Sequence, residues 1–168
     1  MKILAVDSSS ITASVALVEG EKVISEFFMN AGLTHSQTLA PMIDSVLKNA
    51  NVDPSEIDLY AVTDGPGSFT GLRIAASTVK AMALAMNKPC VGVSSLEALA
   101  YNFCDFEGLV CPCMDARRNQ VYTALFRAKD KKIVRIIEDS ADTIENLVRK
   151  LNEYDEKIEF VGDGSESC

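Results

Sequence analysis

One order of elements occurs twice along this chain, and this repetition constrains the fold more than any single segment does. The apolar run 2–7 is typical of a buried strand that ends in Asp7, and two strands, a helix and a further strand follow it. The same order begins again near residue 109, with a strand that ends in Asp115. A β-β-β-α-β unit is therefore predicted twice.

Apolar periodicity and turn residues predict where the individual elements lie. In the first copy we expect strands at 2–7, 12–18, 23–29 and 59–63 and a helix at 36–49. A helix at 72–86, a strand at 90–93 and a helix to about residue 101 extend this copy. In the second copy we expect strands at 109–114, 121–127, 133–137 and 158–161 and a helix at 142–151.

This duplicated order predicts the fold class. A three-stranded meander followed by a helix and a returning strand, present twice, is the core of the actin/hexokinase/heat-shock (ASKHA, ribonuclease H-like) fold. We therefore predict an α/β protein with duplicated βββαβ lobes and mixed sheets. The boundary is expected near residues 104–108, which gives an N-terminal lobe at 1–104 and a second lobe at 105–168. The second copy lacks the later elements of the first, so we expect its C-terminal part to be missing.

The composition excludes several classes of protein. The 168 residues are 48% hydrophobic and 24% charged, which allows a sizeable core and is not a disordered composition. The first residues turn acidic too soon for a signal peptide, and no apolar run approaches the roughly 20 residues that span a bilayer. We therefore expect a cytoplasmic protein with no membrane partner. Its net charge of −8 repels phosphate backbones, so the chain alone should bind nucleic acid poorly.

Metal chemistry has little support in the sequence. His35 is the only histidine, so a histidine-based metal site is not indicated, and a position at a helix N-terminus is the simpler interpretation. Cys111 and Cys113 share one face of a strand, but a metal would need two more ligands. We predict no metal site. Free buried thiols are the expectation for all five cysteines, which are Cys90, Cys104, Cys111, Cys113 and Cys168.

The turns after the two aspartates are the candidate nucleotide site. In active proteins of this fold these turns carry glycine, which lets backbone N–H groups approach phosphate, and one aspartate helps to hold the metal. Here the turns, residues 7–10 and 115–119, contain no glycine. Weak ATP or ADP binding through hydroxyl and guanidinium groups is one interpretation, and aspartates that cap turns are the other. The candidates for weak binding are Asp7, Ser9, Asp115 and Arg117.

The segment 65–71, Gly-Pro-Gly-Ser-Phe-Thr-Gly, lies between a predicted strand and a predicted helix. It is not a Walker loop, because no Gly-Lys-Ser/Thr follows, and its spacing differs from the dinucleotide-binding fingerprint. We interpret its glycines as a structural turn and expect Ser68 or Thr70 as the N-cap of the helix. These glycines are Gly65, Gly67 and Gly71.

Two helices of the first copy carry few charges. The only charged side chains are Arg73 and Lys80 in residues 72–86, and Asp44 and Lys48 in residues 36–49. Such a helix is either buried between a sheet and a second layer, or it meets another subunit with one face. We predict the second arrangement, and the outward face of each helix stays open at this point. The predicted partner-binding residues are His35, Leu39, Met42, Ile43, Val46, Arg73, Ala76, Val79, Lys80 and Ala83.

Several stretches together resemble one family. They are residues 3–9, 14–17, His35-Ser36 with Leu39 and Pro41, 65–74, and 114–118 with Tyr122. In these stretches the chain resembles the TsaB (YeaZ) family of bacterial tRNA modification, and the Gly65–Ile74 and Asp115–Arg118 stretches are the most specific. The resemblance runs from residue 1 to about 164, and family members continue beyond that point.

The resemblance implies a function. Members pair with the catalytic paralogue TsaD through helices of the first lobe and, with the ATPase TsaE, take part in N6-threonylcarbamoylation of adenosine 37 in tRNA. A TsaB-like chain would be a non-catalytic scaffold or activating subunit that forms homodimers when alone, contacts tRNA only through the complex and needs no cofactor beyond weak or interfacial ATP or ADP. The alternative is a metal-dependent enzyme of the same fold, either ATPase- or sugar-kinase-like or a glycoprotease-type metallopeptidase. The metal motif of the catalytic paralogue corresponds here to Ser95-Leu96-Glu97-Ala98-Leu99, in which both histidines are replaced.

Overall fold

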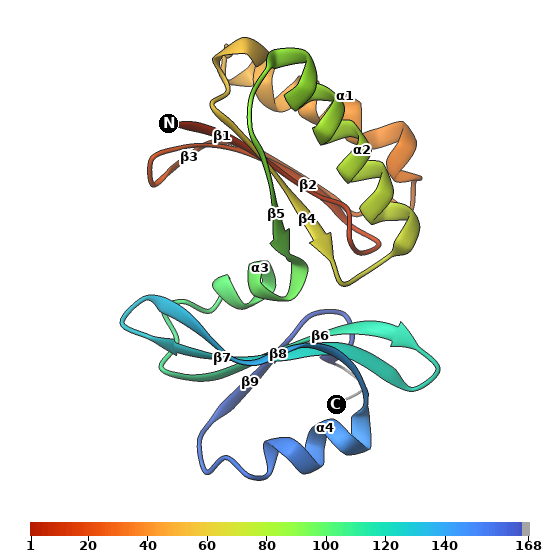
Figure 1. Cartoon of the computed structure of the whole chain (residues 1–168), viewed down its shortest axis with the longest axis vertical. Helices are drawn as coiled ribbons and strands as arrows, with labels where there is room; N and C mark the ends of the chain where they lie inside the picture. The colour runs from red at the N-terminus through yellow and green to blue at the C-terminus, as the bar shows by residue number, and fades with distance from the viewer. Residues whose placement is uncertain (166–168) are drawn as a thin grey trace. The chain divides into compact units, whose positions relative to one another are not determined.

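The computed structural model describes residues 1–165 and divides the chain into two compact units, Met1–Val93 and Ser94–Cys168 (Figure 1). The predicted boundary lay about ten residues later and grouped the helix α3, Ser95–Tyr101, with the first lobe. In the structure α3 contacts the strands of the second sheet, so it belongs to the second unit.

The first unit contains a five-stranded sheet with the order β3-β2-β1-β4-β5. Its first three strands, β1 (Lys2–Asp7), β2 (Ala13–Glu19) and β3 (Lys22–Met29), form an antiparallel meander. The fourth strand, β4 (Leu59–Gly65), returns parallel to β1, and β5 (Cys90–Ser94) lies beside it. The carboxyl ends of β1 and β4 therefore meet at one edge of the sheet, next to the candidate site.

The two helices α1 (His35–Asn49) and α2 (Phe69–Met86) lie on the same face of this sheet (Figure 1). The apolar stripe of α1 and the small side chains of α2 pack on the inward side chains of the strands, such as Leu4, Val15 and Tyr60. A short 3-10 helix, Pro54–Glu56, precedes β4, and a capping box between Asp53 and Glu56 marks its N-terminus.

The second unit repeats this arrangement with a four-stranded sheet of order β8-β7-β6-β9. An antiparallel meander is formed by β6 (Gly108–Arg117), β7 (Gln120–Lys129) and β8 (Lys132–Thr143). After the helix α4 (Ile144–Leu151), the strand β9 (Ile158–Val161) returns parallel to β6. Strand order and direction thus match β3-β2-β1-β4, which confirms the predicted duplication.

The helices of the second unit cover opposite faces of its sheet (Figure 1). One core cluster joins α3 to side chains such as Val110 and Phe126, and another joins α4 to side chains such as Leu109 and Leu125. The mainly buried guanidinium of Arg135 lies 4.6 Å from the Phe126 ring centroid and pairs with Glu97 of α3 and with Asp139. These contacts hold the start of α3 against β8.

The predicted elements are present, and several bounds differ for local reasons. Helix α2 begins at Phe69 rather than near residue 72, because the Ser68 hydroxyl accepts a hydrogen bond from the Gly71 N–H and acts as N-cap. It ends at Met86, and the next residue, Asn87, adopts the left-handed conformation that often follows a helix. Strand β8 is longer than predicted and continues through residues 138–143, all of which except Ala141 are polar. Within the described part of the chain, no helix is long and apolar enough to cross a membrane.

Candidate functional site

The Asp7 carboxylate closes the turn that follows β1. Its Oδ1 atom accepts a hydrogen bond from the Ser9 N–H at 2.9 Å and another from the Thr63 hydroxyl at 2.5 Å. Thr63 lies at the end of the neighbouring parallel strand β4. The Asp7 carboxylate therefore links the turn after β1 to strand β4, which is the role of a capping residue.

The glycine-rich segment lies directly on this turn. A Cβ atom at Gly67 would overlap the carbonyl oxygen of Ser9, and one at Gly71 would overlap the carbonyl oxygen of Ser8. The Ser68 N–H donates to Ser9 O at 2.6 Å, and the Ser8 hydroxyl donates to Gly71 O at 2.9 Å. Glycine is required at these two positions because two backbones approach each other without room for a side chain.

As a result, the first aspartate turn has little free surface. Ser8 and Ser9 are almost fully buried, and the Ser9 N–H and carbonyl oxygen already have partners. Nitrogen Nε2 of His35 lies 2.8 Å from Ser10 O, so this nitrogen carries the proton and donates it. A phosphate group could reach these backbone groups only if the glycine-rich segment moved away.

The second aspartate turn is a tight hairpin between β6 and β7. Asp115 Oδ1 accepts from the Arg117 N–H at 2.7 Å, and Asp163 Oδ1 accepts from the Asp115 N–H at 3.1 Å. The backbone φ angle is positive at three successive residues, none of which is glycine. The values are 65° at Arg117, 55° at Arg118 and 62° at Asn119. Left-handed backbone of this kind is disfavoured for arginine, so the turn is locally strained.

The segment after β9 approaches β6 much as the glycine-rich segment approaches the turn after β1. A Cβ atom at Gly162 would overlap the carbonyl oxygen of Cys113, and one at Gly164 would lie 3.0 Å from the carbonyl carbon of Met114. The Gly164 N–H also donates to Cys113 O at 3.0 Å. The duplication therefore includes a glycine turn at each returning strand, which the sequence analysis did not identify.

The structure corrects much of the predicted partner surface. Most of the predicted apolar residues are buried in the core of the first unit, because the apolar stripe of each helix packs on its own sheet. In this chain their side chains face the core of the first unit rather than its outer surface. Arg73 and Lys80 are exposed, whereas His35 and Ala76 are half-buried. The buried members are Leu39, Met42, Ile43, Val46, Val79 and Ala83.

The outward face of α2 is a different set of residues. We define this α2 face as Phe69, Arg73, Ser77, Lys80 and Leu84, which recur every three or four positions and are all exposed. Phe69 and Leu84 are 73% and 83% exposed, which is unusual for side chains of this size.

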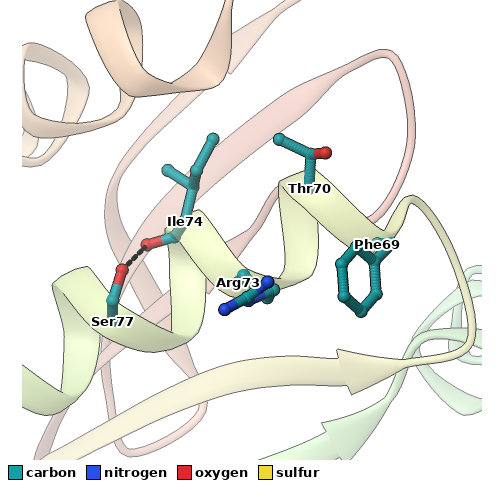
Figure 2. A pocket seen from close by; sticks show the side chains of 5 residues that line it. All are labelled: Phe69, Thr70, Arg73, Ile74 and Ser77. Atoms are coloured by element: carbon teal, nitrogen blue, oxygen red, sulfur yellow. Dashed lines mark hydrogen bonds between the residues drawn. The ribbon is translucent and has the colours of Figure 1, made fainter.

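A shallow depression of about 360 Å³ lies at the start of α2 (Figure 2). Its lining consists of Phe69, Thr70, Arg73, Ile74 and Ser77. Figure 2 shows Arg73 and Phe69 on one side of the helix, and the guanidinium carbon lies 5.1 Å from the ring centroid. One turn further along α2, the Ser77 hydroxyl donates a hydrogen bond to the carbonyl oxygen of Ile74 at 3.0 Å.

Within residues 1–165, the cysteines do not form a recognisable metal centre. The Sγ atoms of Cys111 and Cys113 are 3.9 Å apart, and both are close to the Thr123 hydroxyl in the core below α4. Cys90 is exposed and Cys104 is half-buried, contrary to the expectation that all thiols are buried, and Cys168 lies outside the described residues. Among residues 1–165, no three His, Cys, Asp or Glu side chains gather as metal ligands do.

Comparison with known proteins adds independent information. The family model for tRNA N6-adenosine threonylcarbamoyltransferase, TsaD, matches residues 29–166. The tRNA threonylcarbamoyladenosine biosynthesis protein TsaB of Bacillus subtilis is 36% identical over 162 residues, which are 96% of this chain and 71% of that protein. TsaB of Haemophilus influenzae is 37% identical over 127 residues, which are 73% of this chain and 52% of that protein.

A solved structure from Pseudomonas aeruginosa, described as an uncharacterized protein with similarity to peptidase YEAZ, has a TM-score of 0.78 and 30% identity. The match covers 84% of this chain and 66% of that one. Against these three proteins the chain therefore spans between 52% and 71% of the length of its relatives.

The matching strand orders of the two sheets, each with an aspartate on its first strand, define an actin/hexokinase/heat-shock-type (ASKHA) protein. The same class was predicted from the order of elements. Within this class, the chain belongs to the family of the threonylcarbamoyltransferase model, in its TsaB (YeaZ) branch.

Proposed function

We propose that this chain is a non-catalytic partner subunit in the biosynthesis of N6-threonylcarbamoyladenosine in tRNA. It would act in the cytoplasm with a TsaD-like catalytic paralogue and a TsaE-like ATPase, and it would contact tRNA only through that complex. The similarity to the B. subtilis TsaB protein over 96% of the chain supports the pathway.

One observation supports the absence of catalysis more than any other. The turn after β1, which holds phosphate in active members of this fold, is covered by the glycine-rich segment at Gly67 and Gly71. The backbone groups of Ser9 have partners within the protein. Because this closure is built into the first unit, tight binding of nucleotide by the chain alone would cost several buried hydrogen bonds.

The partner contact is proposed for the exposed α2 face rather than for the buried residues that the sequence analysis selected. Phe69 and Leu84 present apolar surface at the two ends of the helix, and Arg73 and Lys80 lie between them. Exposed aromatic and aliphatic side chains beside an arginine are typical of binding surfaces. A homodimer in the absence of the paralogue would use the same region.

A complementation experiment tests this function. The modified nucleoside is measured by mass spectrometry in tRNA from cells whose own TsaB-type gene is deleted, after expression of this chain with the paralogue from its own genome. We expect the modification to return. We also expect it to return with Asp7→Asn and Asp115→Asn, because an amide oxygen keeps the acceptor that each turn needs.

Two results would contradict the proposal. One is a folded, expressed chain that leaves the tRNA unmodified. The other is purified chain that hydrolyses ATP with a divalent metal and loses this activity in both aspartate variants, which would favour the enzyme alternative.

A further inference from the structure

Two cysteines lie side by side in the core of the second unit. Cys111 and Cys113 occupy alternate positions on β6, so their side chains point to the same face of the strand. Their Sγ atoms are 3.9 Å apart, and both side chains are fully buried. The Thr123 hydroxyl of β7 lies 3.3 Å from the first sulfur and 3.8 Å from the second. Two thiols and a hydroxyl are thus in mutual contact within an otherwise apolar core.

The backbone between the two sulfurs is suited to a closer approach. Two residues of a strand span about 6.6 Å, which lies within the range of about 4.4–6.8 Å that a disulfide bridges between Cα atoms. Pro112 between them has no N–H to donate to a neighbouring strand. The register of β6 with β7 runs from Gly108 to Val110 and resumes at Cys113. Strand β6 is therefore held less tightly at Pro112 than on either side, and a small pucker there brings the sulfurs to a bonding distance of about 2.05 Å.

From these contacts we propose that Cys111 and Cys113 are a redox-sensitive pair, which hydrogen peroxide converts to a disulfide within the chain and a dithiol reductant restores. One thiol, as its thiolate, attacks the peroxide, breaks the O–O bond and becomes a sulfenic acid, with release of water. The second sulfur then attacks the sulfenic sulfur and expels its oxygen as a second water. The two thiols together lose two protons and two electrons, and the peroxide takes up both. This chemistry is independent of the pathway in which the chain takes part.

The helix α4 controls access to the pair from one face of the second sheet (Figure 1). Its buried side chains, Leu147 and Leu151, belong to the same core cluster as both cysteines. A helix of eight residues with one buried face is a weak cover, because few contacts hold it and short helices have little stability of their own. Peroxide therefore reaches the sulfurs when α4 detaches, so the rate of oxidation follows this local opening.

Oxidation also affects the contacts at the end of β6. The Cys113 carbonyl oxygen accepts a hydrogen bond from the Gly164 N–H at 3.0 Å, and a Cβ atom at Gly162 would overlap the same oxygen. Two residues further along β6, the Asp115 N–H donates to Asp163. A backbone shift at Cys113 loosens these contacts, so we expect faster amide hydrogen exchange in the segment after β9 when the disulfide is present.

Mass spectrometry tests the pair directly. The variant Cys90→Ser/Cys104→Ser/Cys168→Ser keeps Cys111 and Cys113 as the only thiols. The folded variant is treated with hydrogen peroxide, freed of it and then unfolded. We expect an intact mass lower by two hydrogen atoms, no reaction with N-ethylmaleimide, and recovery of both thiols with dithiothreitol. The matched control carries Cys113→Ser as well, and its monomer should show no such loss.

A second arm tests the cover. In the same background, Leu147→Ala removes buried contacts of α4, and we expect the disulfide to form about tenfold or more faster. The control Val148→Ala changes an exposed neighbour and should alter the rate by less than about twofold. If a variant does not fold, peptide mapping of peroxide-treated wild type identifies the same disulfide without any substitution.

Several results would overturn the proposal. One is a folded chain in which both thiols still react with N-ethylmaleimide after peroxide treatment. Another is a gain of oxygen on sulfur without a disulfide, or a disulfide that joins two chains. A disulfide that forms only in urea concentrations that unfold the whole chain would also exclude a pair poised in the native fold. Equal rates in Leu147→Ala and Val148→Ala would refute the role of α4 as the cover.

Discussion

Substitution of Gly71 by alanine tests the contact between the glycine-rich segment and the turn after β1. In most helices this change stabilises by about 0.5–1 kcal/mol, because alanine has the higher helix propensity. Here we expect the opposite sign, since the added Cβ would overlap the backbone carbonyl of Ser8 and no flexible side chain is there to move away.

The magnitude follows from what must be displaced. Separating the two backbones lengthens the Ser8 Oγ–Gly71 O bond of 2.9 Å and the Ser68 N–Ser9 O bond of 2.6 Å. Each lost hydrogen bond in a buried place costs about 1 kcal/mol, and overpacking adds about 1–3 kcal/mol. After subtraction of the helix-propensity gain, Gly71→Ala should lower the free energy of unfolding by about 2–4 kcal/mol.

Urea unfolding followed by circular dichroism measures this change, since the chain contains no tryptophan for fluorescence. The control is Ser77→Ala, an exposed substitution in the same helix, which should change stability by less than about 0.5 kcal/mol. A Gly71→Ala variant as stable as wild type, or more stable, would refute the close-approach argument.

Three further predictions concern other parts of the two units. Asp7→Ala should destabilise by about 1–3 kcal/mol in urea, because it leaves the Ser9 N–H and the Thr63 hydroxyl without their acceptor, whereas Asp7→Asn should cost less. Arg135→Met should speed amide hydrogen exchange in α3 but not in α4, because Glu97 and Asp139 lose the cation between them. An equal change in exchange rate in both helices, relative to wild type, would contradict this. The hydrogen bond from Lys150 lowers the pKa of Asp142 below its ordinary value of 3.8, so this carboxylate stabilises the fold above that pH, and the contribution is lost as the pH falls through the lowered pKa. Asp142→Asn should therefore unfold with a weaker dependence on pH in acid titrations than wild type does.

The order of elements was predictable because apolar periodicity and turn residues are local properties. The strand β1 follows directly from such patterns, whereas the N-cap of α2 was predicted as Ser68 or Thr70 and the structure selects Ser68. The duplicated topology needed only the recognition that the order repeats, and the matching sheets confirm it.

The outward faces of the helices were less predictable, for two different reasons. Helix α1 has a clear apolar stripe that includes Leu39 and Val46, and its period indicates burial on its own sheet, so a low number of charges was a poor guide to a partner. Helix α2 is apolar or small nearly all round, so only the structure distinguishes buried Val79 from exposed Leu84.

The contacts of the candidate site were the least predictable, because they join distant residues. Ser8 and Gly71 are 63 positions apart, and Asp115 and Asp163 are 48 apart. No local pattern links such pairs, although the shared Gly-x-Gly-Ser pattern at 65–68 and 162–165 was a signal that sequence comparison within the chain could have found.

These long separations have a consequence for synthesis on the ribosome. The meander β1–β3 emerges first, yet the turn after β1 is covered only when Gly67 and Gly71 have been synthesised. In the second unit, the contacts of β6 with Gly162 and Asp163 likewise form only after those residues have been synthesised. Each nascent sheet thus spends most of its own translation with an uncovered edge, when chaperones have access to it and premature aggregation is a risk.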